Sequence, residues 1–260
     1  MPFSELPAPL FCGILAALLG AVFGSFLNCT AFRVARKESF FSGHSRCPHC
    51  KHDLNALDLV PVFSWLFLGG KCRYCKHKIS PRYLITELLF ALLSAACLVC
   101  FGLTALALRN WVFLCCLLTL SLVDLEIYEI PDACLIISAL AWIAAQVFLW
   151  TNWGDCLLHV AAGLVYGGVV LGVSLLLDKL LKKESLGGGD IKLLAVAGLY
   201  LGFVPALFAL ILACVIGLVQ AKLSGKLKGK AIPFGPAVSA ATTVMLFFGE
   251  PIAAWYLSLF

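Results

Sequence analysis

Charged residues are scarce in this chain: of its 260 residues only 13% are Asp, Glu, Lys or Arg, whereas 62% are hydrophobic. A soluble core of this size cannot hide so much apolar surface, so the composition excludes a large soluble domain. Apolar runs of about 18 residues or more, the length that a helix needs to cross a bilayer, recur along nearly the whole chain. The composition therefore predicts an all-α polytopic membrane protein.

The first apolar run lacks a basic flank before it and a small-residue cleavage site after it, so we expect a retained span and not a removed signal peptide. The apolar runs predict about eight transmembrane helices, over residues 8–32, 83–106, 110–127, 133–151, 156–177, 191–204, 205–221 and 236–257. The sixth and seventh are short and are separated by little more than Pro205. These two are compatible with a broken hairpin.

Basic residues are nearly absent from every second loop between these spans. Of the 19 Lys and Arg residues, all but Arg109 fall within residues 33–82, 178–192 and 222–235. By the positive-inside rule these three regions are cytoplasmic, and with an even number of spans both termini are expected outside. Membrane topology thus explains the net charge of +5, and we expect no nucleic-acid partner.

The thirteen cysteines fall into two groups. Most lie in or beside apolar runs, as small buried hydrophobic residues do. The other four form two knuckles, Cys47-Pro-His-Cys50 and Cys72-Arg-Tyr-Cys75, in the long basic loop between the first two spans. This spacing is typical of a zinc ribbon, in which four thiolates close a tetrahedral structural site and leave no position for a catalytic water. The alternative, disulfides or free thiols, is disfavoured because the cytoplasm is reducing.

Two further features of this loop allow alternatives. Nearby histidines offer substitute metal ligands: His44, His49, His52 and His77. The apolar segment 58–70 is too short to cross a membrane. We expect it to pack against the metal-binding loop or to lie at the membrane surface.

Acidic residues are few, and two of them stand out by position. Asp124 ends the third predicted span and Asp190 begins the sixth, so the topology places both at the cytoplasmic interface. An ionisable group in a span is costly and therefore indicates a functional site. The alternatives are that each acid simply lies at the membrane interface, or that Asp190 caps the N-terminus of a helix. A cap does not explain the preceding Gly187, Gly188 and Gly189. Three glycines favour an unusual backbone and a cleft in which an extended chain can dock.

Two carboxyl groups held close together share one proton, so that one acts as general base on a water and the other as general acid. This is the chemistry of aspartic proteases. An ion-coupled transporter or proton relay that uses the interfacial carboxylates is the main alternative, but we find no convincing inverted repeat. A third possibility is a zinc-ribbon adaptor on a membrane anchor, in which neither acid is needed.

Two other polar residues each allow two interpretations, and a group of glycines allows one. Glu87 either supports a substrate or forms a salt bridge with Arg82 at the end of a span. Lys192 either acts on Asp190 or extends its amine towards the headgroups. The glycines of the fifth predicted span indicate close helix packing, and they are Gly163, Gly167, Gly168 and Gly172.

The order of these motifs resembles that of the bacterial type IV prepilin peptidases, the leader-cleaving and N-methylating members of the GxGD group of intramembrane aspartic proteases. The resemblance covers nearly the whole chain. It rests on Gly24-Ser25-Phe26-Leu27-Asn28, the two cysteine knuckles, Ser80-Pro81-Arg82-Tyr83 followed by Glu87, Asp124 followed by Ile130-Pro131-Asp132, Gly187-Gly188-Gly189-Asp190-Ile191-Lys192-Leu193, and Pro233-Phe234-Gly235-Pro236.

The resemblance implies that Asp124 and Asp190 are the catalytic pair of a prepilin leader peptidase. It implies that Gly187, Gly188, Gly189, Lys192 and Glu87 line or support the substrate cleft, and that Cys47, Cys50, Cys72 and Cys75 bind a structural zinc ion. Residues 1–34 then form the first transmembrane helix, residues 35–82 a cytoplasmic metal-binding loop, and residues 83–260 the transmembrane peptidase core.

The expected substrates are prepilins or pseudopilins of type IV pili or protein secretion, each with a basic leader, a Gly-Phe-type junction and an apolar helix in the bilayer. The expected location is the bacterial cytoplasmic membrane, with the active site on the cytoplasmic face. The resemblance also implies N-methylation of the new N-terminal residue from S-adenosylmethionine, for which the sequence identifies no binding residues.

Overall fold

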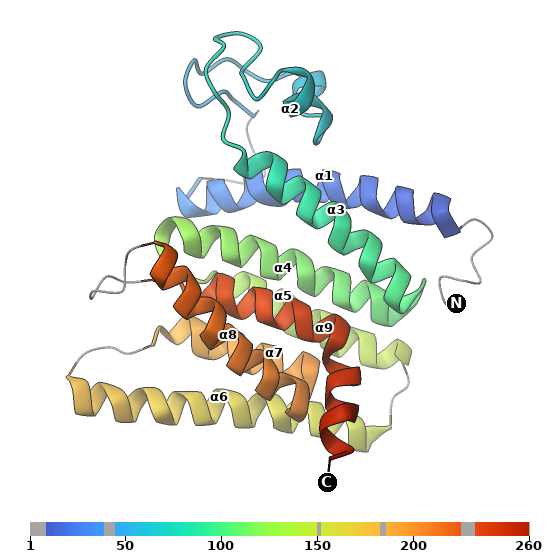
Figure 1. Ribbon diagram of the computed structural model, residues 1–260, viewed down its shortest axis with the longest axis vertical. Coiled ribbons are helices and arrows are strands. Elements are labelled where there is room, and N and C mark those ends of the chain that lie inside the picture. Colours follow the sequence, from blue (N-terminus) through green and yellow to red (C-terminus); the bar gives the residue numbers. More distant parts are fainter. Residues whose placement is uncertain (1–8, 39–44, 150–151, 183–185, 225–231, 260) are drawn as a thin grey trace. The chain divides into compact units, whose positions relative to one another are not determined.

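The computed structural model describes residues 9–38, 45–149, 152–182, 186–224 and 232–259 (Figure 1). These residues form helices and connecting segments; the described ranges contain no strand, only two isolated β-bridges. The predicted all-α class is confirmed. The chain divides into two compact units, residues 1–111 and residues 112–260, and each is described separately below.

Each of the eight predicted helical ranges overlaps one helix, and all but one of these helices are long. These helices are α1 (Pro9–Ala35), α3 (Arg82–Phe101), α4 (Ala105–Ile127), α5 (Asp132–Leu149), α6 (Trp153–Leu181), α7 (Gly188–Leu201), α8 (Phe203–Leu223) and α9 (Gly235–Leu257). Among the described residues, seven helices are long and apolar enough to cross a membrane, and α7 is not one of them. With 14 residues, α7 is about 21 Å long, whereas the hydrocarbon core is about 30 Å thick. The chain is a multi-pass membrane protein in which α7 is a short helix.

The break between α7 and α8 lies at Gly202, and the prediction of Pro205 as the separator is wrong. Gly202 ends α7 and begins α8 with φ +74°, a left-handed conformation that glycine adopts without steric cost. Pro205 lies instead in the first turn of α8, where its missing N–H is tolerated. The two helices are therefore separate elements joined by one residue.

In the first unit, α1 and α3 pack against each other along a seam of small residues (Figure 1). A Cβ atom at Gly20 would lie 2.5 Å from Ser94 Oγ, and one at Gly24 would lie 3.1 Å from Glu87 Cα. A side chain at Gly20 would clash, and one at Gly24 would be tight, as is common where membrane helices approach closely. Between the two helices the chain forms the cysteine-containing loop, with the short helices η2 (Ala56–Asp58) and α2 (Phe63–Phe67).

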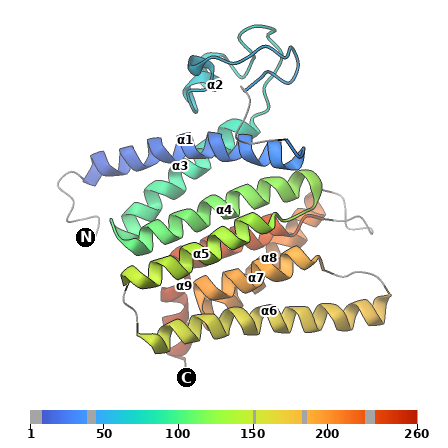
Figure 2. The ribbon, with the colours of Figure 1, turned by 180° about the vertical axis from the view of Figure 1, so that it is seen from behind.

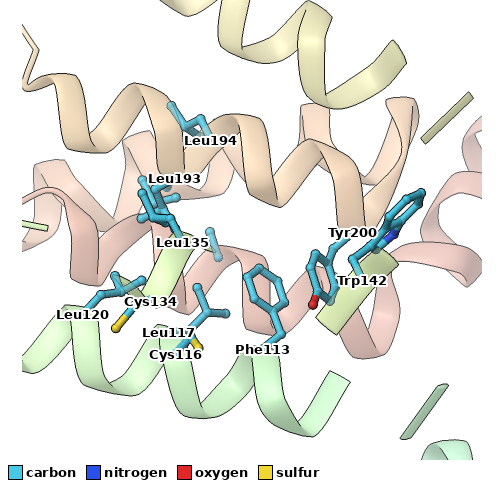
Figure 3. Close-up of a cluster of buried hydrophobic side chains, with 13 residues drawn as sticks. Phe113, Cys116, Leu117, Leu120, Cys134, Leu135, Trp142, Leu193, Leu194 and Tyr200 are labelled. Carbon is cyan, nitrogen blue, oxygen red and sulfur yellow. The ribbon is translucent and has the colours of Figure 1, made fainter. Parts of the chain in front are cut away.

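Most of the core of the second unit lies between α4, α5 and α7 (Figure 3), and Ala213 of α8 and Val238 and Ala241 of α9 complete it. Phe113 of α4 stacks on Tyr200 of α7 with ring centroids 3.8 Å apart. The Tyr200 hydroxyl donates a hydrogen bond of 2.8 Å to the backbone carbonyl of Ser138 in α5, so the only polar atom of that ring is satisfied. These contacts fix α7 against the two helices that flank the Asp124–Asp132 segment.

Helix α6 packs against α7 through the glycines that the sequence singles out (Figure 2). A Cβ atom at Gly163 would lie 2.9 Å from the carbonyl oxygen of Ala195, and one at Gly167 would lie 2.9 Å from Ala195 Cβ. The prediction of close packing holds for these two. It is wrong for Gly168 and Gly172, because a Cβ atom there would meet nothing within 4 Å.

This difference predicts opposite effects for the same substitution on one helix. Gly163→Ala forces α6 away from α7 and should destabilise the protein by about 1–3 kcal/mol. Gly172→Ala is the matched control, and it should be neutral or stabilising by up to about 1 kcal/mol, because alanine is the better helix former. Unfolding of the purified variants in detergent measures both, and equal effects at the two positions would contradict the glycine seam.

Candidate active site and metal-binding loop

Asp124 lies in the last turn of α4 and is almost fully buried, with 4% of its surface exposed. Its Oδ2 accepts a hydrogen bond of 2.9 Å from the backbone N–H of Gly235, the first residue of α9. The N-cap residue of α9, Phe234, has no side-chain cap, so the Asp124 carboxyl group takes that role from another helix. A Cβ atom at Gly235 would lie 2.7 Å from Oδ2, which explains why a glycine stands there.

Asp190 is half-buried in the first turn of α7. The N-cap of α7 is Gly187, so the alternative reading of Asp190 as a helix cap is wrong. Its Oδ1 is buried without a hydrogen-bond partner, and the carboxyl group lies within electrostatic range of Asp124. The structure thus brings together two carboxyl groups that are far apart in sequence, at the end of α4 and the start of α7.

The glycines before Asp190 serve a different purpose from the one expected. Gly187 has an ordinary extended backbone, with φ −67°, and Gly188 and Gly189 are the first residues of α7, so the prediction of an unusual backbone is wrong here. A Cβ atom at Gly189 would lie 2.9 Å from Ile130 Cβ, whereas one at Gly188 would meet nothing within 4 Å. Gly189 is needed for close packing, whereas Gly188 borders open space.

Reasoning from the residues alone does not identify Gly235 or Ile130 as parts of this site. Both belong to motifs that carry the family resemblance, Pro-Phe-Gly-Pro and Ile-Pro-Asp, and those motifs are the only signal for them in the sequence. A backbone N–H that binds a carboxylate from another helix leaves no trace in side-chain chemistry.

Lys192 has a partner that neither expectation for it names. Its Nζ lies 2.7 Å from Asp132 Oδ1, and both side chains are more than half exposed. An exposed pair of this kind contributes about 0–1 kcal/mol. It nevertheless joins the start of α7 to the start of α5, on the same side as the two acids.

Glu87 is buried in α3 and binds the cysteine-containing loop. Its Oε2 accepts a hydrogen bond of 2.7 Å from the backbone N–H of Val62. Val62 has φ +64°, a conformation that costs a β-branched residue of the order of 1–3 kcal/mol. Glu87 therefore holds a strained turn at the start of α2, an anchoring contact within the first unit.

The four patterned cysteines converge on one point. The Sγ atoms of Cys47, Cys50, Cys72 and Cys75 all lie within 4.8 Å of one another, and those of Cys47 and Cys75 are 3.9 Å apart. A tetrahedral zinc ion with Zn–S bonds of about 2.3 Å would need sulfur atoms about 3.8 Å apart. No disulfide forms among the described cysteines, and this thiol set fits a metal ion.

The two knuckles share one backbone conformation. The N–H of Cys47 bonds to the carbonyl of His52, as that of Cys72 bonds to the carbonyl of His77. Burial raises the pKa of Cys47, but hydrogen bonds from the backbone of Cys50 and His49 and from the thiols of Cys50 and Cys72 outweigh it, and the pKa falls to about 7. Backbone N–H groups directed at a sulfur atom are the environment of a metal-binding thiolate.

The described histidines of the loop have other contacts. His49 stacks on His77 with ring centroids 4.1 Å apart, and His52 stacks on Tyr74. The metal-ligand group found in the described part of the chain contains only the four cysteines. His44 lies outside the described residues.

The apolar segment 58–70 leaves several of its large side chains exposed. Its helix α2 leaves Phe67 86% and Leu66 55% exposed, which fits the expected place at a membrane surface better than packing within the loop. At its start, Asp58 receives hydrogen bonds from Arg73 and Tyr74 of the second knuckle. Burial raises the pKa of Asp58, but these bonds and one from Asn55 lower it overall.

The thiol geometry predicts one tightly bound metal ion per chain. Cys47→Ser should abolish metal retention and loosen the loop, because metal binding is coupled to folding in such sites. Cys214→Ser is the matched control, since Cys214 is exposed on α8, outside the group. Metal analysis of the purified proteins and protease sensitivity of the loop measure both effects, and a metal-free wild type with a protected loop would contradict the prediction.

Comparison with known proteins places these features in a family. Residues 18–101 match the bacterial peptidase A24 N-terminal domain, and residues 111–221 match the type IV leader peptidase family. No solved structure matches the chain.

Full-length relatives agree with the family models. The chain is 31% identical to the prepilin leader peptidase/N-methyltransferase of Bacillus subtilis, over 93% of this chain and 96% of that protein. It is 33% identical to the protein of the same name from Aeromonas hydrophila, over 95% and 94% of the two chains. The corresponding Pseudomonas aeruginosa protein is 31% identical, over 96% and 94%. The chain therefore belongs to the type IV leader peptidase family, a family of proteases that includes bifunctional prepilin leader peptidase/N-methyltransferases.

Proposed function

We propose that this protein is a membrane-embedded aspartic endopeptidase that removes the basic leader peptide of type IV prepilins or pseudopilins. The observation that carries the proposal is that Asp124 and Asp190, from helices far apart in sequence, lie within electrostatic range of each other. The names of the relatives supply the substrate class.

The two acids differ in surroundings, and this assigns their roles. Asp124 receives the Gly235 N–H and lies at the positive end of α9, which stabilises a carboxylate. Asp124 is the general base that takes a proton from the attacking water. Asp190, with a buried Oδ1 that lacks a partner, holds the shared proton and donates it to the oxygen of the scissile carbonyl. When the C–N bond breaks, Asp124 gives the proton it took from water to the amine nitrogen, and a hydroxyl group of the tetrahedral intermediate returns a proton to Asp190 as the new carboxyl group forms.

We place the two acids at the cytoplasmic face of the bacterial inner membrane. The support is the basic character of 33–82, 178–192 and 222–235, on the same side of the predicted topology as both acids. We count the short α7 as an eighth crossing, so that both termini lie outside. Residues 1–34 then form the first span, residues 35–82 a cytoplasmic loop, and residues 83–260 the peptidase core. A substrate with its leader in the cytoplasm and its apolar helix in the bilayer then presents the scissile bond at the interface.

We assign zinc to the four-cysteine group, with a structural role. Four thiolates in a tetrahedral arrangement are the ligand set of structural zinc, and they leave no site for a reacting water. The ion would therefore fold the loop and take no part in peptide hydrolysis.

The relatives are named as N-methyltransferases as well as peptidases, and we propose the same second activity here. S-adenosylmethionine would supply the methyl group for the new N-terminal amine. The alternative of an ion-coupled transporter has no observation in its favour.

The proposed acid pair predicts that the protein loses activity when either acid is removed. In membranes carrying the protein, Asp124→Asn and Asp190→Asn should each lower the cleavage of a prepilin-like substrate by at least about 100-fold, because each removes one partner of the proton transfer. Asp155→Asn, at an exposed position on α6, is the matched control and should cut normally. Labelled S-adenosylmethionine in the same assay should mark the new N-terminus in the wild type.

The variants must be shown to insert and to retain the metal ion before their activities are compared. If both Asn variants then cut like the wild type, the acid pair is not the catalytic centre. If the wild type cuts but leaves the new terminus unlabelled, the peptidase stands and the transferase does not.

A further inference from the structure

One apolar side chain lies between the two segments that carry the acids. Ile130 stands in the connection between α4 and α5, before Pro131, which restricts its backbone to extended conformations. The preceding turn is sharp, because Tyr128, the residue after α4, has φ +59°. Ile130 is half-buried and packs against the hydrophobic core of the second unit, so its position is fixed by that core.

Ile130 touches a glycine on each of two sides. A Cβ atom at Gly189 would lie 2.9 Å from Ile130 Cβ and 3.4 Å from its Cγ1. A Cβ atom at Gly235 would lie 3.3 Å from Ile130 Cδ1. The first residues of α7 and α9 are therefore packed directly on the two ends of one isoleucine side chain.

Each of these glycines is bonded to a catalytic candidate. Gly189 is the residue before Asp190, and the N–H of Gly235 holds Asp124 Oδ2 at 2.9 Å. A shift of either helix start relative to Ile130 would move one carboxyl group and leave the other in place. Two carboxyl groups share a proton and flank a peptide bond only at a suitable separation, and a misplacement of about 1 Å can lower a rate about 100-fold.

We propose that Ile130 is a positioning residue that sets the separation of the Asp124 and Asp190 carboxyl groups, acting as the spacer between the N-termini of α7 and α9. This inference rests on the proposed peptidase function. It assigns Ile130 no contact with the substrate. An ordinary core residue would contribute to stability alone, whereas a spacer must also affect the catalytic step in proportion to its size.

A size series at this position tests the proposal. Ile130→Val removes Cδ1, the atom nearest Gly235, and should lower kcat a few-fold. Ile130→Ala removes both γ carbons as well and should lower kcat by roughly 100-fold, with KM changed by less than about twofold, because the substrate-binding surface is unaltered. Both variants should alter the pH dependence of kcat, since the coupling of two carboxyl groups depends on their separation.

A substitution from the opposite side gives an independent check. Gly189→Ala inserts a methyl group against Ile130 and should also lower kcat, although the Ile130 side chain is intact. Ile136→Ala on α5 is the matched control: it removes the same atoms from an isoleucine that is 57% exposed, and it should leave kcat unchanged. Thermal unfolding of each variant shows the folded fraction at the assay temperature.

The spacer inference is overturned if folded Ile130→Ala has the same kcat and pH profile as Ile136→Ala. It is also overturned if Ile130→Ala loses activity only because it unfolds, while Ile130→Val, which should fold, has the kcat of the wild type. Its failure is distinguishable from that of the proposed function. If the Asn variants of both acids are inactive while Ile130→Ala is fully active, the acid pair stands and the spacer does not. If the Asn variants cut normally, the proposed function itself fails.

Discussion

The hydrogen bond from the Gly235 N–H to Asp124 Oδ2 is the interaction on which the candidate site depends. A carboxyl group that is 96% buried in a helix of a membrane protein is costly unless a donor satisfies it, and a helix N-terminus offers donors that need acceptors. One bond meets both requirements. It fixes the start of α9 to the end of α4, and Ile130 and Gly189 then bring the start of α7 to the same place.

The long helices are predictable from the sequence because apolar runs of membrane length have few other solutions. The cysteine knuckles are predictable because ligand spacing is a local property. Asp124 and Asp190 stand out because ionisable side chains are rare in such runs, and the charge asymmetry between the loops predicts that both lie on one side of the membrane. These features depend on composition and local spacing, which one sequence displays.

Contacts between distant residues are not predictable in this way. The hydrogen bond from the Gly235 N–H to Asp124 depends on where α9 begins relative to α4. The sequence gives no sign of it, because almost every residue has a backbone N–H. The reason for glycine at position 189 is Ile130, which is distant in the chain. Likewise, Lys192 pairs with Asp132, and Glu87 holds the strained Val62, through tertiary geometry alone. The length of α7 follows from Gly202, whose turn conformation the apolar run conceals.

The central claim is that Asp124 and Asp190 act as one pair that shares a proton, and the pH dependence of kcat/KM for leader cleavage tests it most directly. The account predicts a bell-shaped profile, because activity requires one carboxyl group ionised and the other protonated and is lost when both are protonated or both are ionised. A rate that stays constant across the acidic range, or that rises with pH to a plateau without an alkaline limb, would contradict a shared proton.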